Sequence, residues 1–82
     1  MRELVYLRGT LKFLRKSDLK TRKRIVNAID KIPIGDIKML QGDKKPPVYR
    51  LRIGKYRVIY HFDHSENVLT IVKIDTRGDA YK

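Results

Sequence analysis

The sequence predicts an α+β fold in the order β-α-α-β-β-β, with an antiparallel sheet covered on one face by a two-helix hairpin. Two observations predict this class. Apolar residues of the N-terminal half recur at helical spacing, whereas those of the C-terminal half alternate with polar residues, as in half-buried strands. The 82 residues suffice for one hydrophobic core, so we expect a single domain over residues 1–82.

The N-terminal half is expected to hold a first strand over residues 3–7 and then two helices. Thr10 can cap the first helix, and Ser17 or Asp18 the second, because these side chains accept hydrogen bonds from free backbone N–H groups. The apolar residues of the second helix share one broad face: Leu19, Ile25, Val26, Ile29 and Ile32. Pro33 ends this helix.

Residues 36–47 are expected to form a connector. Pro46 and Pro47 could not lie in a central strand, and the glycine and lysines before them are typical of a turn. The apolar residues of the connector are expected to reach back to the core: Ile37, Met39 and Leu40.

Residues 48–62 predict a β-hairpin. Apolar and polar residues alternate on both sides of Gly54 and Lys55, which supply a two-residue turn. A last, β-branched strand is expected over residues 68–74. Tyrosines and aliphatic residues would fill the helix-covered face of the sheet, and four basic residues would share the open face: Arg50, Arg52, Arg57 and His61.

Charge is the strongest signal in the composition. Twenty Lys and Arg stand against nine Asp and Glu, a formal net charge of +11. Nucleic acid is a natural partner, because neutralising phosphates releases condensed counterions. Acidic proteins and anionic membranes are alternatives, and a basic surface can also serve solubility alone. No segment approaches the ~20 apolar residues of a membrane span, and the N-terminus lacks the apolar run of a secretory signal. We therefore expect a cytoplasmic protein without a membrane partner.

The residue types exclude most of the common catalytic arrangements. There is no cysteine and no glycine-rich phosphate loop, and Ser17 and Ser65 lie at an expected cap and turn. His61 and His64 lack the spacing of metal ligands. We expect neither a metal nor a cofactor, so any chemistry would depend on arginines, a tyrosine and His61.

The open face is a candidate phosphate site. Neighbouring cations repel one another unless an anion joins them, and arginine suits phosphate oxygens. The hairpin positions on this face hold no carboxylate before Asp63. Arg77 and Tyr81 follow the last strand and could close over a bound phosphate. The alternatives are a sheet face that is simply polar and a charged C-terminal tail without function.

The hairpin also carries a motif. Tyr49-Arg50-Leu51-Arg52-Ile53-Gly54-Lys55-Tyr56-Arg57-Val58-Ile59-Tyr60 closely resembles the hairpin signature of the RelE/ParE toxin superfamily, commonly Y-R-L-R-V-G-x-Y-R-V-I-Y. The segment from Arg77 to Tyr81 looks like the family's closing R-x-x-x-Y element. Residues 11–14 and the following helix are similar to its N-terminal helical hairpin. The resemblance implies the RelE-like fold.

For function, the resemblance implies an endoribonuclease that cleaves mRNA in the ribosomal A site. The ribose 2′-hydroxyl attacks the adjacent phosphate, so neither a metal nor a cofactor takes part. Arg50 and Arg52 match the family's two basic positions, and Arg57 its phosphate-binding arginine. Arg77 and Tyr81 match the residues implicated in leaving-group and base-stacking roles.

One departure from the family concerns Arg50 and Arg52, where the best-studied pattern has lysines. A guanidinium scarcely loses its proton, so Arg50 is a poor base and a good electrostatic clamp. His61, on the same face, is a candidate for the base.

The resemblance also implies an acidic, RelB-like antitoxin that forms a hetero-oligomer with this chain and covers the helices. Two alternatives share the fold: a ParE-like inhibitor of DNA gyrase, and a non-toxic member that only binds its antitoxin or nucleic acid.

Overall fold

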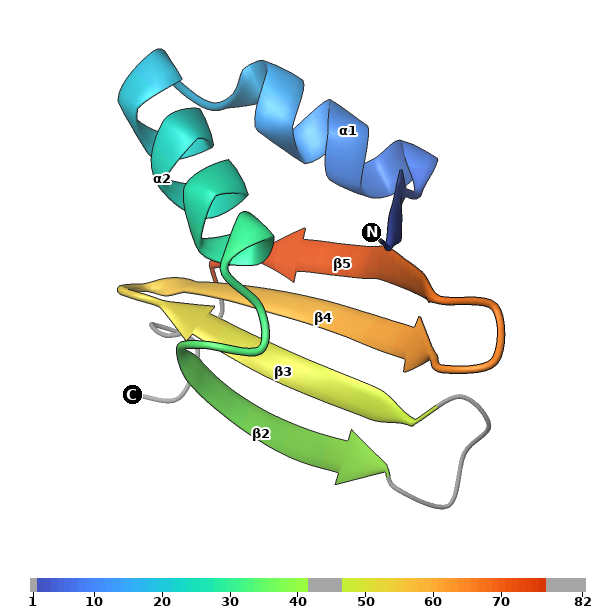
Figure 1. Cartoon of the computed structure of the whole chain (residues 1–82). Coiled ribbons are helices and arrows are strands. Elements are labelled where there is room, and N and C mark those ends of the chain that lie inside the picture. Colours follow the sequence, from blue (N-terminus) through green and yellow to red (C-terminus); the bar gives the residue numbers. More distant parts are fainter. Residues whose placement is uncertain (1, 42–46, 77–82) are drawn as a thin grey trace.

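The structure, a computed structural model, describes residues 2–41 and 47–76 (Figure 1). In chain order the elements are β1 (Glu3–Tyr6), α1 (Arg8–Lys16), α2 (Leu19–Asp30), β2 (Asp36–Gln41), β3 (Val48–Ile53), β4 (Tyr56–Asp63) and β5 (Val68–Asp75). The strands form one five-stranded sheet in the order β1-β5-β4-β3-β2, and both helices lie on the same face of it (Figure 1). The predicted α+β class, with a helical hairpin on one face, is confirmed.

The sheet is mixed, not wholly antiparallel as expected. β1 pairs with β5 in parallel, whereas β2 with β3, β3 with β4 and β4 with β5 are antiparallel. The helical hairpin carries the chain across the sheet after β1, so the first strand lies beside the last one (Figure 1).

The expected connector over residues 36–47 was wrong in its first half, where the structure has strand β2. β2 pairs with β3 from Asp36 opposite Arg52 onward, with a register shift between Met39 and Gln41. Only Ile37 packs against the core; Met39 and Leu40 are exposed. An edge strand has one neighbour and one partly covered face, so it needs little apolar alternation and leaves a weak sequence signal. The expected turn residues 42–46 lie outside the described part of the chain.

The helix starts differ in part from the expected caps. α1 begins at Arg8 with Leu7 at the N-cap. Thr10 is fully buried and its Oγ1 donates a hydrogen bond to the Leu7 carbonyl at 2.6 Å, so it lies inside the first turn and is not the cap. Asp18 occupies the N-cap position of α2, as expected, but its side chain makes no capping hydrogen bond to the helix backbone; α2 ends at Asp30, before Pro33.

The core lies between the helices and the central strands. Ile25 and Ile29 of α2 are fully buried against Leu51 of β3 and Val58 of β4. The predicted alternation of the hairpin is confirmed: Leu51, Ile53, Val58 and Tyr60 are buried toward the helices, and the arginines and Ile59 face the other side. The helices thus cover one face of the sheet and leave the other open.

A register shift between β4 and β5 determines which β5 side chains face the core and which face the open side of the sheet. Tyr60 pairs with Ile71 but Ile59 pairs with Lys73, so Val72 is an extra residue in β5, a β-bulge. Ile71 and Ile74 are both buried, although side chains three residues apart point to opposite faces in a regular strand. The bulge thereby turns Lys73 and Asp75 onto the open face.

Candidate functional site

The strand register gathers charged side chains into rows across the open face. Asp36 lies opposite Arg52, Arg52 opposite Arg57, and Arg57 opposite Asp75. In the next row the register places four residues side by side: Lys38, Arg50, Ile59 and Lys73. We call the basic residues of these two rows, on β2 to β5, the basic face.

Arg50 is largely covered by its neighbours. Its side chain is only 16% exposed, and its guanidinium forms an ion pair and hydrogen bond with Asp36 at 3.4 Å. Its Nε atom is buried and lacks a hydrogen-bond partner within residues 2–41 and 47–76. An anion above the basic face is the kind of group that would satisfy such a donor.

Arg57 lies in the centre of its row. Its guanidinium forms an ion pair with Asp75 at 3.5 Å, and Lys73 lies 3.8 Å from the same carboxylate. The Arg57 and Asp75 side chains are 24% and 17% exposed. Arg52, directly across from Arg57 on β3, is exposed.

The hairpin positions hold no carboxylate before Asp63, as the sequence indicated, but the neighbouring strands bring two carboxylates onto the same face. Asp36 enters from β2, the segment expected to be a connector, and Asp75 from the end of β5, one residue beyond the expected strand. Both belong to neighbouring strands that a reading of the hairpin alone leaves out. The available sequence signals were weak: Asp36 directly follows Gly35, and Asp75 directly follows the β-branched residues of the last strand.

His61 is on the open face, but away from the centre of the basic face. It lies between Val48 and Thr70, four residues along β4 from Arg57, which at strand spacing is about 13 Å. It is half-buried, and its Nδ1 atom has no hydrogen-bond partner among the described residues. The structure therefore brings Arg50, Arg52 and Arg57 together and sets His61 apart. Arg77 and Tyr81 lie outside the described residues.

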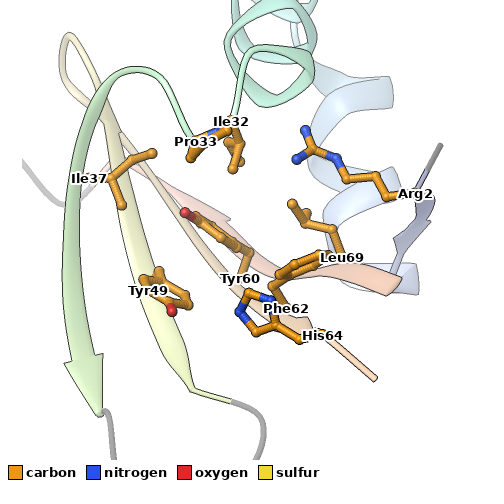
Figure 2. Close-up of a pocket in the computed structure, with 9 residues that line it drawn as sticks. All are labelled: Arg2, Ile32, Pro33, Ile37, Tyr49, Tyr60, Phe62, His64 and Leu69. Carbon is orange, nitrogen blue, oxygen red and sulfur yellow. The ribbon is translucent and has the colours of Figure 1, made fainter. Parts of the chain in front are cut away.

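An aromatic cavity opens on the other face of the sheet. It has a volume of about 220 Å³ and lies under the loop that follows α2 (Figure 2). Its lining comes from β2 to β5 and the flanking loops and N-terminal segment: Arg2, Ile32, Pro33, Ile37, Tyr49, Tyr60, Phe62, His64 and Leu69. The sequence predicted that the tyrosines fill the core, and it gave no sign of a cavity beside them. The cavity exists because the helices cover only part of this face of the sheet.

Aromatic contacts hold the walls of this cavity. Tyr49 and Tyr60 stack with ring centroids 5.3 Å apart, and Phe62 meets His64 edge-on at 4.5 Å. Burial raises the pKa of Tyr60 to about 12; the neighbouring Tyr49 adds to the rise, and Arg2 opposes it. The cavity therefore has apolar walls with a cation at its margin (Figure 2).

The outer face of α1 is basic. Arg8, Lys12 and Arg15 surround the exposed Leu11 at a second hollow, of about 540 Å³, which Tyr6 also lines. Burial raises the pKa of the Tyr6 hydroxyl, and the charge of Asp30 raises it further. This helix face offers cations beside an apolar residue, the complement of an acidic, partly apolar chain.

No helix in the described part of the chain is long and apolar enough to cross a membrane. Nor do three metal-binding side chains of the His, Cys, Asp or Glu type gather anywhere among those residues.

Comparisons with known proteins agree with this architecture. The family model for the ParE toxin of type II toxin–antitoxin systems, parDE, matches residues 4–81. A protein of Methanocaldococcus jannaschii named RelE1 is 41% identical over 76 residues, which cover 88% of this chain and 82% of that protein.

Solved structures show the same fold. A chain of the archaeal RelE–RelB complex from Pyrococcus horikoshii superposes with a TM-score of 0.83 at 26% identity, over 95% of this chain and 97% of that one. The isolated Escherichia coli RelE toxin matches with a TM-score of 0.67 at 20% identity, over 99% and 92% of the two chains.

The fold, the basic face and these matches define the class: a toxin of a type II toxin–antitoxin system. Within that class the chain belongs to the ParE toxin family of the RelE/ParE superfamily, as the hairpin motif predicted, and it is RelE-like in sequence and structure.

Proposed function

We propose that this toxin is a ribosome-dependent endoribonuclease that cleaves mRNA in the ribosomal A site. One observation supports the proposal above the others: Arg52 and Arg57 lie directly opposite each other, with Arg50 in the adjoining row. Three guanidinium groups on one open sheet face suit the phosphates of a single strand of RNA. The relatives named RelE agree with this assignment.

The proposed chemistry uses groups that the RNA itself carries. The ribose 2′-oxygen bonds to the adjacent phosphorus as the bond to the 5′-oxygen of the next nucleotide breaks, leaving a cyclic phosphate and a 5′-hydroxyl. The 2′-hydroxyl loses its proton, and the leaving oxygen gains one. The protein has to hold the RNA in line and stabilise the negative charge that develops on the phosphate.

In this scheme Arg57 binds the scissile phosphate, and Arg50 and Arg52 form an electrostatic clamp beside it. A donor aimed at developing charge contributes on the order of a hundred-fold in rate. Arg77 and Tyr81 complete the site, the arginine at the leaving group and the tyrosine stacked on a base.

His61 is proposed as an RNA-binding residue. Its distance of about 13 Å from Arg57 along β4 favours a contact with a neighbouring nucleotide over a role as the base that takes the 2′ proton. A half-buried imidazole can stack on a base or donate to a phosphate.

We propose an acidic, RelB-like antitoxin as the partner, in a toxin–antitoxin hetero-oligomer in the cytoplasm. Several similar solved structures are RelE–RelB complexes, which supports this partner. The basic outer face of α1 complements acidic residues of the antitoxin. The aromatic cavity, at about 220 Å³, exceeds the roughly 150 Å³ that holds a benzene molecule. It therefore has room for one aromatic or branched side chain of the antitoxin.

A second candidate function is inhibition of DNA gyrase in the manner of ParE toxins. It is favoured by the family model, which is the one for ParE toxins. A non-toxic member that only binds antitoxin or nucleic acid is the third candidate, because arginines replace the lysines of the best-studied pattern.

Induced expression in a bacterial host, followed by primer extension on an abundant mRNA, separates these functions. We expect new 5′ ends inside translated codons with the native toxin and with Arg15→Ala, whose side chain is on the outer face of α1. We expect none with Arg57→Ala. Growth arrest with intact transcripts would point to gyrase, and the absence of arrest would point to the non-toxic member.

A further inference from the structure

Asp75 is a carboxylate at the end of a row on the proposed RNA-binding face, where a negative charge is electrostatically unfavourable for RNA. It lies directly opposite Arg57, and the two side chains form an ion pair at 3.5 Å. Both are more than three-quarters buried, so the pair is shielded from much of the surrounding water. A negative charge here weakens RNA binding, so its presence calls for a compensating role.

The β-bulge in β5 is what puts Asp75 on this face. In a regular strand Asp75 would share the face of Ile71, which is buried in the core. The extra residue, Val72, reverses this, so that Asp75 pairs with Arg57 and Lys73 points the same way. Bulges occur next to active sites because they re-aim side chains.

Arg57 is subject to opposing forces from its two cross-strand neighbours. Arg52, on β3, repels its guanidinium, and Asp75, on β5, attracts it. Loss of Asp75 would remove the attraction and leave the repulsion from Arg52, so we expect the guanidinium to be less firmly oriented. A guanidinium has five N–H donors, so one guanidinium can bond to a carboxylate and a phosphate at the same time. Lys73 and Arg52 keep the local charge positive despite the carboxylate.

We propose that Asp75 is a positioning residue that orients Arg57 for the scissile phosphate, an inference that rests on the proposed ribonuclease function. It increases the rate of cleavage at some expense in RNA affinity. Asp36 differs in a way that makes it a control. It also forms an ion pair with an arginine, Arg50, at 3.4 Å, but its side chain is 62% exposed, so solvent screens its attraction for that arginine more strongly.

The test compares Asp75→Asn with Asp36→Asn, each of which removes one negative charge from beside the basic face. We expect both variants to bind a short single-stranded RNA a few-fold more tightly at low salt. Only Asp75→Asn should cleave mRNA on programmed ribosomes more slowly, with kcat lowered on the order of ten- to a hundred-fold and KM unchanged or reduced. Asp75→Glu, which keeps the charge, should recover part of the rate.

Substitution of a residue needed only for folding would not raise the affinity for RNA while lowering the rate of cleavage. Thermal unfolding of each variant verifies that the fold is retained. The proposal is overturned if Asp75→Asn cleaves at the native rate, or if Asp36→Asn loses as much rate as Asp75→Asn.

A second measurement is independent of cleavage. ¹⁵N relaxation of the Arg57 Nε–H group should show an ordered side chain in the native toxin and in Asp36→Asn, and a disordered one in Asp75→Asn. If the native toxin proves not to cleave RNA, the ribonuclease assignment fails, and these spectra still decide whether Asp75 orients Arg57. Equal order in all three proteins would refute the orienting role.

Discussion

The buried Tyr60 predicts how the stability of the fold depends on pH. Tyr60 is only 3% exposed, and burial raises the pKa of its hydroxyl from 10.0 to about 12. In the unfolded chain this hydroxyl ionises near pH 10, whereas in the folded protein it keeps its proton until about pH 12. The folded state therefore binds more protons between these values, and the free energy of unfolding must fall as the pH rises.

The magnitude follows from the change in pKa. At 1.36 kcal/mol per pKa unit, the fold should lose about 2 to 3 kcal/mol between pH 10 and pH 12 through this one group. Below pH 10 the hydroxyl is protonated in both states, so it adds no pH dependence there. Such a loss is a large part of the stability that a domain of this size possesses.

Urea unfolding of the native toxin and of Tyr60→Phe, at intervals from pH 8 to pH 12, measures this contribution. The phenylalanine variant should show a shallower decline above pH 10, by about 2 to 3 kcal/mol at the alkaline end. Tyr49→Phe, which alters the stacked neighbour, is the matched control and should keep most of the native decline. Parallel curves for the native toxin and Tyr60→Phe would refute the argument from burial.

Three further predictions concern the basic face, the core and the cavity. Arg57→Ala should lower the slope of log affinity against log salt for single-stranded RNA by about 0.7, the value for one phosphate contact; an unchanged slope in a salt titration would remove Arg57 from the interface. Ile29→Ala, in the fully buried centre of the core, should lower the free energy of unfolding by about 2 to 5 kcal/mol, whereas Ile34→Ala, 74% exposed, should change it by less than about 0.5 kcal/mol. Ile37→Trp should fill the aromatic cavity and weaken antitoxin binding in calorimetry, whereas Met39→Trp, exposed on the same strand, should bind normally. Equal affinities for the two tryptophan variants would show that the antitoxin does not use the cavity.

The hairpin was predictable because its two faces meet different surroundings. Leu51 and Val58 are pressed against the helices while Arg52 and Arg57 face away, and this difference imposes the period of two on the sequence. The second helix was predictable for the same reason, since Ile25 and Ile29 are buried on one side of it.

The rest depends on pairing between segments, which a single sequence records weakly. β2 lies at the edge of the sheet, and its exposed Met39 and Leu40 break the alternation that would mark a strand. The bulge at Val72 arises from the register between β4 and β5, so the orientation of Asp75 follows from the pairing and not from the local pattern. The placement of Arg50, Arg52 and Arg57 on the open face was predictable from the hairpin, but the carboxylates that pair with two of them were not.

The parallel pairing of β1 with β5 has a consequence for the order of folding. Glu3 pairs with Val68, so joining the first strand to the last closes a loop of about 65 residues. Closing so long a loop costs conformational entropy before any contact compensates it, whereas the β3–β4–β5 meander closes through short turns. We therefore expect the meander to form early and β1 to join it late.

A chain still under synthesis cannot complete this sheet until residues 68–75 have been made. The same residues supply Asp75, so the ion pair with Arg57 and the strand that pairs with β1 become available together. The topology thus delays the finished toxin fold until residues 68–75 have been translated, because the residues before them cannot form the sheet alone.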